Sequence, residues 1–292
     1  MRAAAVLVAA ALAAPAVAVL AAPGTPTAPS GPRPTAQTVA EIVERNADAR
    51  GGLEAWRKID TMVWLGHLDR GNSTDGQPMR FVMELKRPNA TRFEIKSKTQ
   101  QFARIFDGKH GWKVRPGKEG RPEPTAFTKE EVEFARQEFV VDGPLLDADA
   151  KGVKVKFDGL DNVNGRRAYR LSLTLPSGAA RNLWIDTKTN LEFRYDRPST
   201  SPLSPGARVS TYYDDWRAEN GVQVAHRIEV AAAKGRSAAE VSDKLILDRV
   251  LVNPTLDEAA FTPPNVPRAH SGRISVPAET MTPRNAPVAP PR

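Results

Sequence analysis

The spacing of apolar residues divides the middle of the chain into helical and extended segments. Apolar side chains recur every three or four residues after Thr38-Val39-Ala40-Glu41, which has the sequence of an N-terminal capping box. This pattern predicts a helix that Gly51-Gly52 ends, followed by a short helical turn over residues 53–59. A second capping box, Thr128-Lys129-Glu130-Glu131, predicts another helix that ends near Asp142-Gly143-Pro144.

From residue 60 onward the apolar residues alternate with polar ones, which is the period of a half-buried strand. Turn sequences such as Asn164-Gly165 and Asn220-Gly221 separate the alternating stretches. These stretches lie at residues 62–68, 80–86, 92–96, 153–157, 168–175, 181–185, 191–195, 209–216, 222–230 and 241–252. With the stretches around Phe106 and Trp112 they predict about eleven or twelve strands. Because the connections are short, we predict a mainly β (α+β) fold with a single strongly curved antiparallel sheet, covered on its apolar face by the helices.

The two ends of the chain differ in composition from the middle. Residues 1–22, a short basic start and a long run of Ala, Val and Leu, are typical of a secretory signal peptide; an uncleaved membrane anchor is the alternative. The Pro/Thr-rich composition of residues 23–36 predicts a flexible lead, and the Pro-rich, basic composition of residues 267–292 predicts a disordered tail. The predicted folded domain spans residues 37–266, and we expect export to the periplasm.

Charge and cysteine content exclude several classes of function. The net charge is +8, but residues 1–36 carry +2 of it and residues 263–292 carry +3. Residues 37–262 keep only +3, with acidic and basic residues interspersed, so we expect no nucleic-acid partner. The chain has no cysteine, which excludes disulfides, zinc–thiolate sites and thiol nucleophiles.

Residues that could carry catalysis or bind a metal are scattered. The four histidines lie far apart, and none has a second ligand at metal-binding spacing. They are His67, His110, His226 and His270. Asp214-Asp215 would point to opposite faces of a strand, and Glu130-Glu131 lies in the first turn of a helix, where acids complement the helix dipole. We therefore predict no catalytic residue, no metal and no cofactor; a hydrolase with a dispersed site stays open.

Large apolar side chains are abundant on the predicted strands. An ordinary core under two helices would account for any one of them, but together we expect them to exceed what two short helices can cover. A curved sheet would then keep a partly filled apolar cavity, where an acyl chain would contribute about 0.8 kcal/mol per buried methylene. The predicted cavity residues are Trp64, Phe81, Met83, Phe93, Phe106, Trp112, Leu171, Leu173, Trp184 and Phe193.

Several short motifs resemble the LolA/LolB-like superfamily, which includes outer membrane lipoprotein-sorting proteins. They occur in the expected order over about residues 38–266. The motifs are Gly51-Gly52-Leu53-Glu54-Ala55-Trp56, Lys86-Arg87-Pro88-Asn89 followed by Arg92-Phe93-Glu94, Phe106-Asp107-Gly108-Lys109-His110-Gly111-Trp112, Asp142-Gly143-Pro144-Leu145-Leu146 with Lys151-Gly152, Trp184-Ile185-Asp186-Thr187-Lys188-Thr189, and Phe261-Thr262-Pro263-Pro264.

The resemblance implies an incomplete β-barrel with a short helical lid over an apolar cavity. It also implies that Arg87 hydrogen-bonds to the backbone of the lid and favours its closed form; a solvent-exposed arginine at a strand end is the alternative. Asp107-Gly108 is expected to make a tight turn and to have no binding role. The chain is longer than the classical carrier, with a Pro-rich tail and additional strands in its second half, so the fold carries over more safely than the cargo.

The function that we predict is a periplasmic carrier without catalysis. It would bind acyl chains of lipoproteins or other envelope lipids and transfer them toward the outer membrane. An inner-membrane exporter and an outer-membrane acceptor are the implied protein partners. The alternatives are an envelope lipid sensor or assembly factor and, on weaker grounds, a lipid hydrolase.

Overall fold

One antiparallel sheet dominates the computed structural model, which describes residues 36–69, 79–96, 101–117, 122–199, 207–233 and 240–263. Thirteen strands lie in the order β6-β5-β4-β3-β2-β1-β13-β12-β11-β10-β9-β8-β7. They are β1 (Thr61–Leu68), β2 (Met79–Lys86), β3 (Ala90–Lys96), β4 (Gln101–Phe106), β5 (Gly111–Pro116), β6 (Pro122–Ala126), β7 (Lys154–Val163), β8 (Arg166–Thr174), β9 (Ala180–Asp186), β10 (Glu192–Pro198), β11 (Arg208–Glu219), β12 (Val222–Ala233) and β13 (Glu240–Val252).

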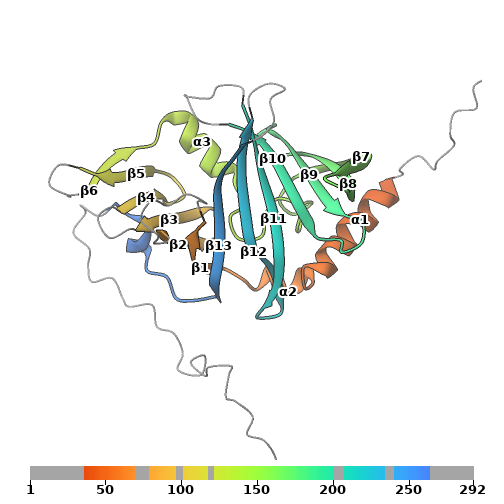
Figure 1. Ribbon diagram of the computed structural model, residues 1–292, viewed down its shortest axis with the longest axis horizontal. Coiled ribbons are helices and arrows are strands. Elements are labelled where there is room, and N and C mark those ends of the chain that lie inside the picture. The colour runs from red at the N-terminus through yellow and green to blue at the C-terminus, as the bar shows by residue number, and fades with distance from the viewer. Residues whose placement is uncertain are drawn as a thin grey trace, which may run out of the picture. The chain divides into compact units, whose positions relative to one another are not determined.

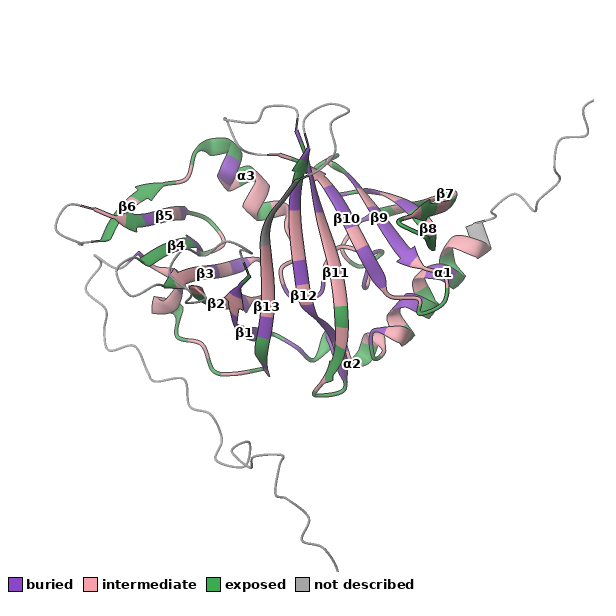
Figure 2. Ribbon diagram, viewed as in Figure 1, coloured by how far each residue is buried: buried purple, intermediate pink, exposed green. Residues whose placement is uncertain are grey.

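The sheet is open, because β6 and β7 are its two edges and do not pair with each other. Figure 1 shows how it curls, with β11–β13 in the middle and the other strands bending away on both sides. Both edge strands are largely exposed, as the green segments of Figure 2 show. The predicted single, strongly curved antiparallel sheet, an incomplete barrel with few helices, is therefore confirmed.

Two hairpins show how local sequence sets the pairing of the strands. Asn164-Gly165 joins β7 to β8, and Asn220-Gly221 joins β11 to β12, in each case with a positive φ at both turn residues. Such turns match the right-handed twist of paired strands, and Asn-Gly adopts them without strain. Among the described strands, the one pairing between strands that are not neighbours in the sequence is that of β1 with β13. It joins the beginning of the sheet to its end.

The helices differ from the prediction at their ends. Helix α1 (Ala36–Ala49) starts before Thr38, which therefore does not cap it, and α2 (Leu53–Arg57) follows. Helix α3 (Lys129–Gln137) has the predicted capping box, since the Thr128 hydroxyl accepts from the Glu131 N–H and the Glu131 carboxylate accepts from the Thr128 N–H. This helix ends before Asp142, so its predicted end was wrong. Extended backbone at Glu138 ends it, and turns follow to residue 152.

Buried side chains form separate clusters along the sheet. The largest lies under α2, with Trp56, Met62 and Leu85 among its members. A second packs Ile42 of α1 against the strands β7–β10, and a third holds Phe261 of the 3-10 helix η2 (Glu258–Phe261) against β4 and β5. Each end of the sheet thus has its own cover. Within the described residues, no helix is both long and apolar enough to cross a membrane.

Candidate functional site

A cavity of about 590 Å³ lies against the inner face of the sheet. Strands β1–β4 and β9–β13 contribute to its wall, and α3 with residues 138–145 covers it. Its volume is within the roughly 300–1,000 Å³ of sites that enclose small molecules. The curl of the sheet leaves this space because α1 and η2 pack at the two ends of the sheet and not at its centre.

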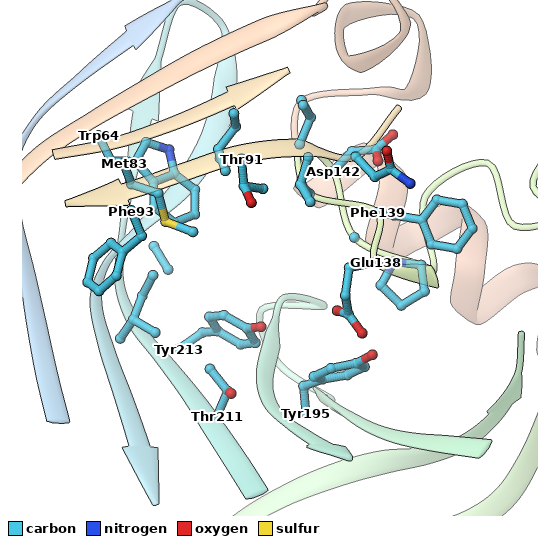
Figure 3. Close-up of a pocket in the computed structure, with 18 of the residues that line it drawn as sticks. Trp64, Met83, Thr91, Phe93, Glu138, Phe139, Asp142, Tyr195, Thr211 and Tyr213 are labelled. Atoms are coloured by element: carbon cyan, nitrogen blue, oxygen red, sulfur yellow. The ribbon is translucent and has the colours of Figure 1, made fainter. Parts of the chain in front are cut away.

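One side of the cavity is apolar. Trp64, Met83 and Phe93 lie together there on β1, β2 and β3, as Figure 3 shows. They occupy facing positions on neighbouring strands, since Trp64 pairs with Met83 and Met83 pairs with Phe93. Aliphatic side chains complete this surface: Leu68, Ile95, Ile228, Val230 and Leu245.

Four of the ten residues predicted for an apolar cavity line it: Trp64, Met83, Phe93 and Phe106. Phe106 is 1% exposed and stacks on Phe127 with ring centroids 6.5 Å apart. Whether these side chains touch a ligand stays a prediction. The other six do not line the cavity: Phe81, Trp112, Leu171, Leu173, Trp184 and Phe193.

Trp184 and Phe193 lie on the opposite face of the sheet from the cavity. Leu183 and Tyr195 pair with each other and line the cavity, so Trp184 faces the other way. A bulge at Phe193, between Glu192 and Arg194, places that side chain beside Trp184.

The remaining four are core residues at other places in the fold. Leu171 and Leu173 pack under Ile42 of α1. Phe81 is 2% exposed in the largest buried cluster, and Trp112 packs against the cluster of β4, β5 and η2. Alternation along a strand assigns a face of the sheet, but it does not reveal which part of that face a helix covers.

Three charged side chains, here called the latch, fasten the segment that covers the cavity. Arg87 donates to the backbone carbonyls of Ile59 at 2.7 Å and Trp56 at 3.1 Å, and to the Asp142 carboxylate at 2.8 Å. The other Asp142 oxygen lies 2.8 Å from Lys151 Nζ. The latch, which consists of Arg87, Asp142 and Lys151, therefore ties the end of β2 and the α2–β1 connection to residues 138–152.

Lys151 also stabilises the turns of this segment from within. Its ammonium group donates to the carbonyl oxygens of Gly143 and Leu146. Burial lowers the pKa of Lys151, and the neighbouring Asp142 carboxylate works against that shift. Asp142 is only 5% exposed, so the latch is a buried ionic contact and not a surface salt bridge.

The other side of the cavity is polar, which the sequence analysis did not anticipate. Glu138, Tyr195 and Tyr213 point into the cavity there, opposite the apolar side (Figure 3). Burial raises the pKa of both tyrosines, and the nearby carboxylates add to the shift. The signal was present in the alternation of β10, where Tyr195 and Arg197 share the inward-facing positions.

A buried ion pair borders this polar side. Arg50 and Glu192 are 8% and 6% exposed, and their side chains meet at 2.8 Å. The Arg50 guanidinium lies between the rings of Trp56 and Trp216, at 4.4 and 5.3 Å from their centroids. The two aromatic rings and the Glu192 carboxylate hold the Arg50 guanidinium in place. Its positive charge therefore stays paired with Glu192 at the border of the cavity.

The three histidines in the described part of the chain each contact an acidic side chain. His226 is buried, with Nδ1 3.0 Å from the Leu247 carbonyl and Nε2 3.0 Å from Glu219. His67 contacts Asp248 and His110 contacts Asp107, both near the surface, and His270 lies outside the described residues. Asp107-Gly108 makes the expected tight turn, in which Asp107 accepts from two backbone N–H groups. No group of three metal-ligating side chains occurs within the described residues.

The comparisons with known proteins find likeness in fold and not in sequence. No protein-family model matches the chain, and no curated protein matches it in sequence. Among solved structures, a LolA superfamily protein from Nitrosomonas europaea is 13% identical, with 77% of this chain and 97% of that chain covered and a TM-score of 0.48. A DUF1329 family protein from Desulfovibrio piger is 14% identical over 77% and 97%, with a TM-score of 0.46.

A similar likeness is found to an outer membrane lipoprotein-sorting protein domain from Vibrio parahaemolyticus. It is 10% identical, covers 78% of this chain and 97% of that chain, and has a TM-score of 0.47. At these identities the likeness concerns the fold. The chain has the open, curled antiparallel sheet that the motifs predicted.

Proposed function

We propose that the protein is a non-catalytic carrier that encloses an acyl chain in the cavity. The observation that carries this proposal is the cavity itself, which has room for a small-molecule ligand and a continuous apolar side centred on Trp64, Met83 and Phe93. Each buried methylene would contribute about 0.8 kcal/mol, so a chain of ten or more carbons gains enough to outweigh the loss of its own freedom.

In this proposal the cargo is a lipoprotein or another envelope lipid, and the place of action is the periplasm. The predicted signal peptide, residues 1–22, and the predicted tail, residues 267–292, lie outside the described residues. Transfer would be passive: residues 138–144 move aside, the acyl chain enters, and it leaves toward the partner that buries it better. An inner-membrane exporter and an outer-membrane acceptor would be the two partners.

Arg87 is the residue that we expect to favour the closed form. Its contacts with two backbone carbonyls and with Asp142 support this role, because the same guanidinium holds two segments that border the cavity. Arginine suits it since its planar fork can donate in several fixed directions at once.

The experiment that tests the carrier uses uncharged ligands of increasing length. Straight-chain alcohols from eight to fourteen carbons displace an apolar fluorescent dye from the purified full-length protein. We expect the affinity to rise about fourfold with each added methylene until the cavity is full. Affinities that do not depend on chain length, or no displacement at all, would contradict the proposal.

Two matched variants locate the binding. Met83→Glu places a carboxylate in the apolar wall and is expected to weaken alcohol binding more than tenfold, because a charge in a closed apolar site is not compensated. Leu160→Glu makes the same chemical change on edge strand β7, where Leu160 is 52% exposed and away from the cavity, and should leave binding unchanged. Equal effects of the two variants would place the ligand elsewhere.

A further inference from the structure

The polar side of the cavity contains a cluster of charged and hydroxyl groups that an acyl chain alone would not use. We call it the polar pole: Glu138, Arg181, Tyr195, Arg197 and Tyr213. Glu138 and Tyr195 lie across the cavity from Trp64, Met83 and Phe93, and Tyr213 lies between Tyr195 and the apolar side (Figure 3). The cavity is therefore amphipathic, with an apolar side and a polar side that face each other.

Some members of the polar pole already form hydrogen bonds and an ion pair with one another. Arg181 is 3% exposed, donates through Nε to the Tyr195 hydroxyl oxygen at 3.1 Å, and meets the Glu138 carboxylate at 3.3 Å. The only acidic member of the pole is thereby paired with the more buried of its two arginines. What is left over is the second arginine.

Arg197 is the arginine of the polar pole that forms no ion pair with any described residue. It lines the cavity, with its guanidinium 4.7 Å from the ring centroid of Phe134 on α3 and one N–H donating to the Pro198 carbonyl at 3.2 Å. Among the described residues, no carboxylate lies within 4 Å of it. Burial lowers its pKa, although the more distant Glu138 opposes the shift. A guanidinium stays charged under these conditions, so its desolvation calls for an anion.

Two hydroxyl groups add donors to the same place. The Tyr195 oxygen accepts from Arg181, and no described residue accepts from the Tyr195 O–H, which can therefore donate to a ligand. No described residue hydrogen-bonds to the Tyr213 hydroxyl, and Tyr213 lines the cavity between Tyr195 and the apolar side. A guanidinium and two phenol groups are a donor set that suits the oxygens of a carboxylate or phosphate.

We propose that the polar pole binds the anionic headgroup of an amphiphile, a carboxylate or a phosphate, while the acyl chain lies along Trp64, Met83 and Phe93. This inference rests on the proposed carrier function and names the class of its ligand. With Arg181 and Arg197 against Glu138, the pole carries one net positive charge, which one headgroup anion balances. Arg197 is the residue that meets the anion, and the two tyrosines orient it.

The test compares three ligands with the same twelve-carbon chain: dodecanoate, dodecyl phosphate and dodecanol. Each displaces the apolar dye from the full-length protein at pH 8 and constant ionic strength, below its micelle concentration. We expect at least one of the two anions to bind ten times or more as tightly as the alcohol. The better of the two identifies the headgroup as carboxylate or phosphate.

A pair of arginine variants assigns the preference to the pole. Arg197→Gln should weaken anion binding ten times or more and weaken dodecanol binding much less, so that the preference for the anion is lost. A cooperative urea transition shows that the variant is folded. Arg167→Gln removes the same charge from an exposed position on β8 outside the cavity and should keep the preference.

The outcomes separate this inference from the function on which it rests. Native protein that binds alcohol and anions equally, or a preference that survives Arg197→Gln, overturns the inference and leaves the carrier intact. Failure of all three ligands to bind overturns both. The comparison of acid with alcohol needs only the native chain, so a misfolded variant does not leave the question open.

Discussion

Replacing Arg87 by leucine is the change that the latch makes most informative. The Arg87 side chain is 28% exposed and forms three hydrogen bonds, one of them to the Asp142 carboxylate, whose own side chain is 5% exposed. A hydrogen bond to a charged group contributes about 1.5–3 kcal/mol, and breaking a buried ion pair costs about 3–5 kcal/mol when the remaining charge has no other partner. Asp142 keeps Lys151 at 2.8 Å, so we expect a loss of about 2–3 kcal/mol in the free energy of unfolding.

Two measurements check this expectation. Urea denaturation gives the global loss, and amide hydrogen exchange should show faster exchange in residues 138–152 than in the strands β11–β13. Arg57→Leu is the control, because Arg57 also binds this segment, through Asp147, but from a side chain that is 48% exposed. It should cost less than Arg87→Leu. An Arg87→Leu loss no greater than that of Arg57→Leu, with unchanged exchange in residues 138–152, would refute the role of Arg87 in closing the cavity.

Two further changes test the acidic groups and the backbone. Burial works to raise the pKa of Glu131, but hydrogen bonds from Thr128 and Lys113 outweigh burial and hold this pKa below its ordinary value. The contribution of Glu131 to the free energy of unfolding is therefore present at neutral pH and is lost as the pH falls through the folded-state pKa. The stability difference between native protein and Glu131→Gln should therefore be smaller at pH 3 than at pH 7; a constant difference would contradict this. Gly51 and Gly52 both have positive φ, but a Cβ on Gly51 would lie 2.3 Å from the Gly221 carbonyl oxygen, whereas one on Gly52 meets nothing within 4 Å. In denaturation experiments Gly52→Ala should lower the free energy of unfolding by about 1–3 kcal/mol, and Gly51→Ala should lower it clearly more. Equal losses would refute the close approach of Gly51 to the Gly221 carbonyl oxygen.

Features that depend on adjacent residues could be predicted from the sequence. The Asn-Gly hairpins and the Thr128 capping box formed as expected, because each is decided within about four residues. The end of α3 could not be predicted, since Glu138 leaves the helix where it meets Arg181, a residue 43 positions away. Such contacts depend on the sheet having formed.

The site was predictable only in part for a related reason. Alternation placed Trp64, Met83 and Phe93 on one face, but the bulge at Phe193 moved that side chain to the other face. The single inserted residue has no signature in the apolar pattern. Arg197 was overlooked because a charged residue near a strand end is usually taken to face solvent, and only its position under Phe134 shows that it lines the cavity.

The distribution of the buried clusters explains how a cavity of this size can coexist with a stable fold. The largest cluster lies under α2, the cluster with Ile42 under α1, and that with Phe261 under η2. Members of the first two also line the cavity, so buried packing on the far side of its wall supports the wall. The covering segment combines two kinds of contact. Leu145 and Leu146 are 1% exposed and anchor its far part in the core. Residues 138–144 combine the ionic contacts of Glu138 and Asp142 with the apolar packing of Val141, which is 5% exposed in the largest cluster.

Ionic contacts of this kind suit the opening and closing of the segment in the proposed carrier. Separating Asp142 from Arg87, or Glu138 from Arg181, lets each group exchange its partner for water, whereas withdrawing Leu145 and Leu146 would expose apolar surface at about 25 cal/mol per Å². Opening should therefore stop at residue 144 and leave the core clusters intact. Hydrogen exchange can decide this: amides of residues 138–144 should exchange by a low-energy opening, and those of residues 145–148 only by the same global unfolding that exposes β12. If both stretches exchange together, the covering segment opens as one piece and the leucines do not act as its hinge.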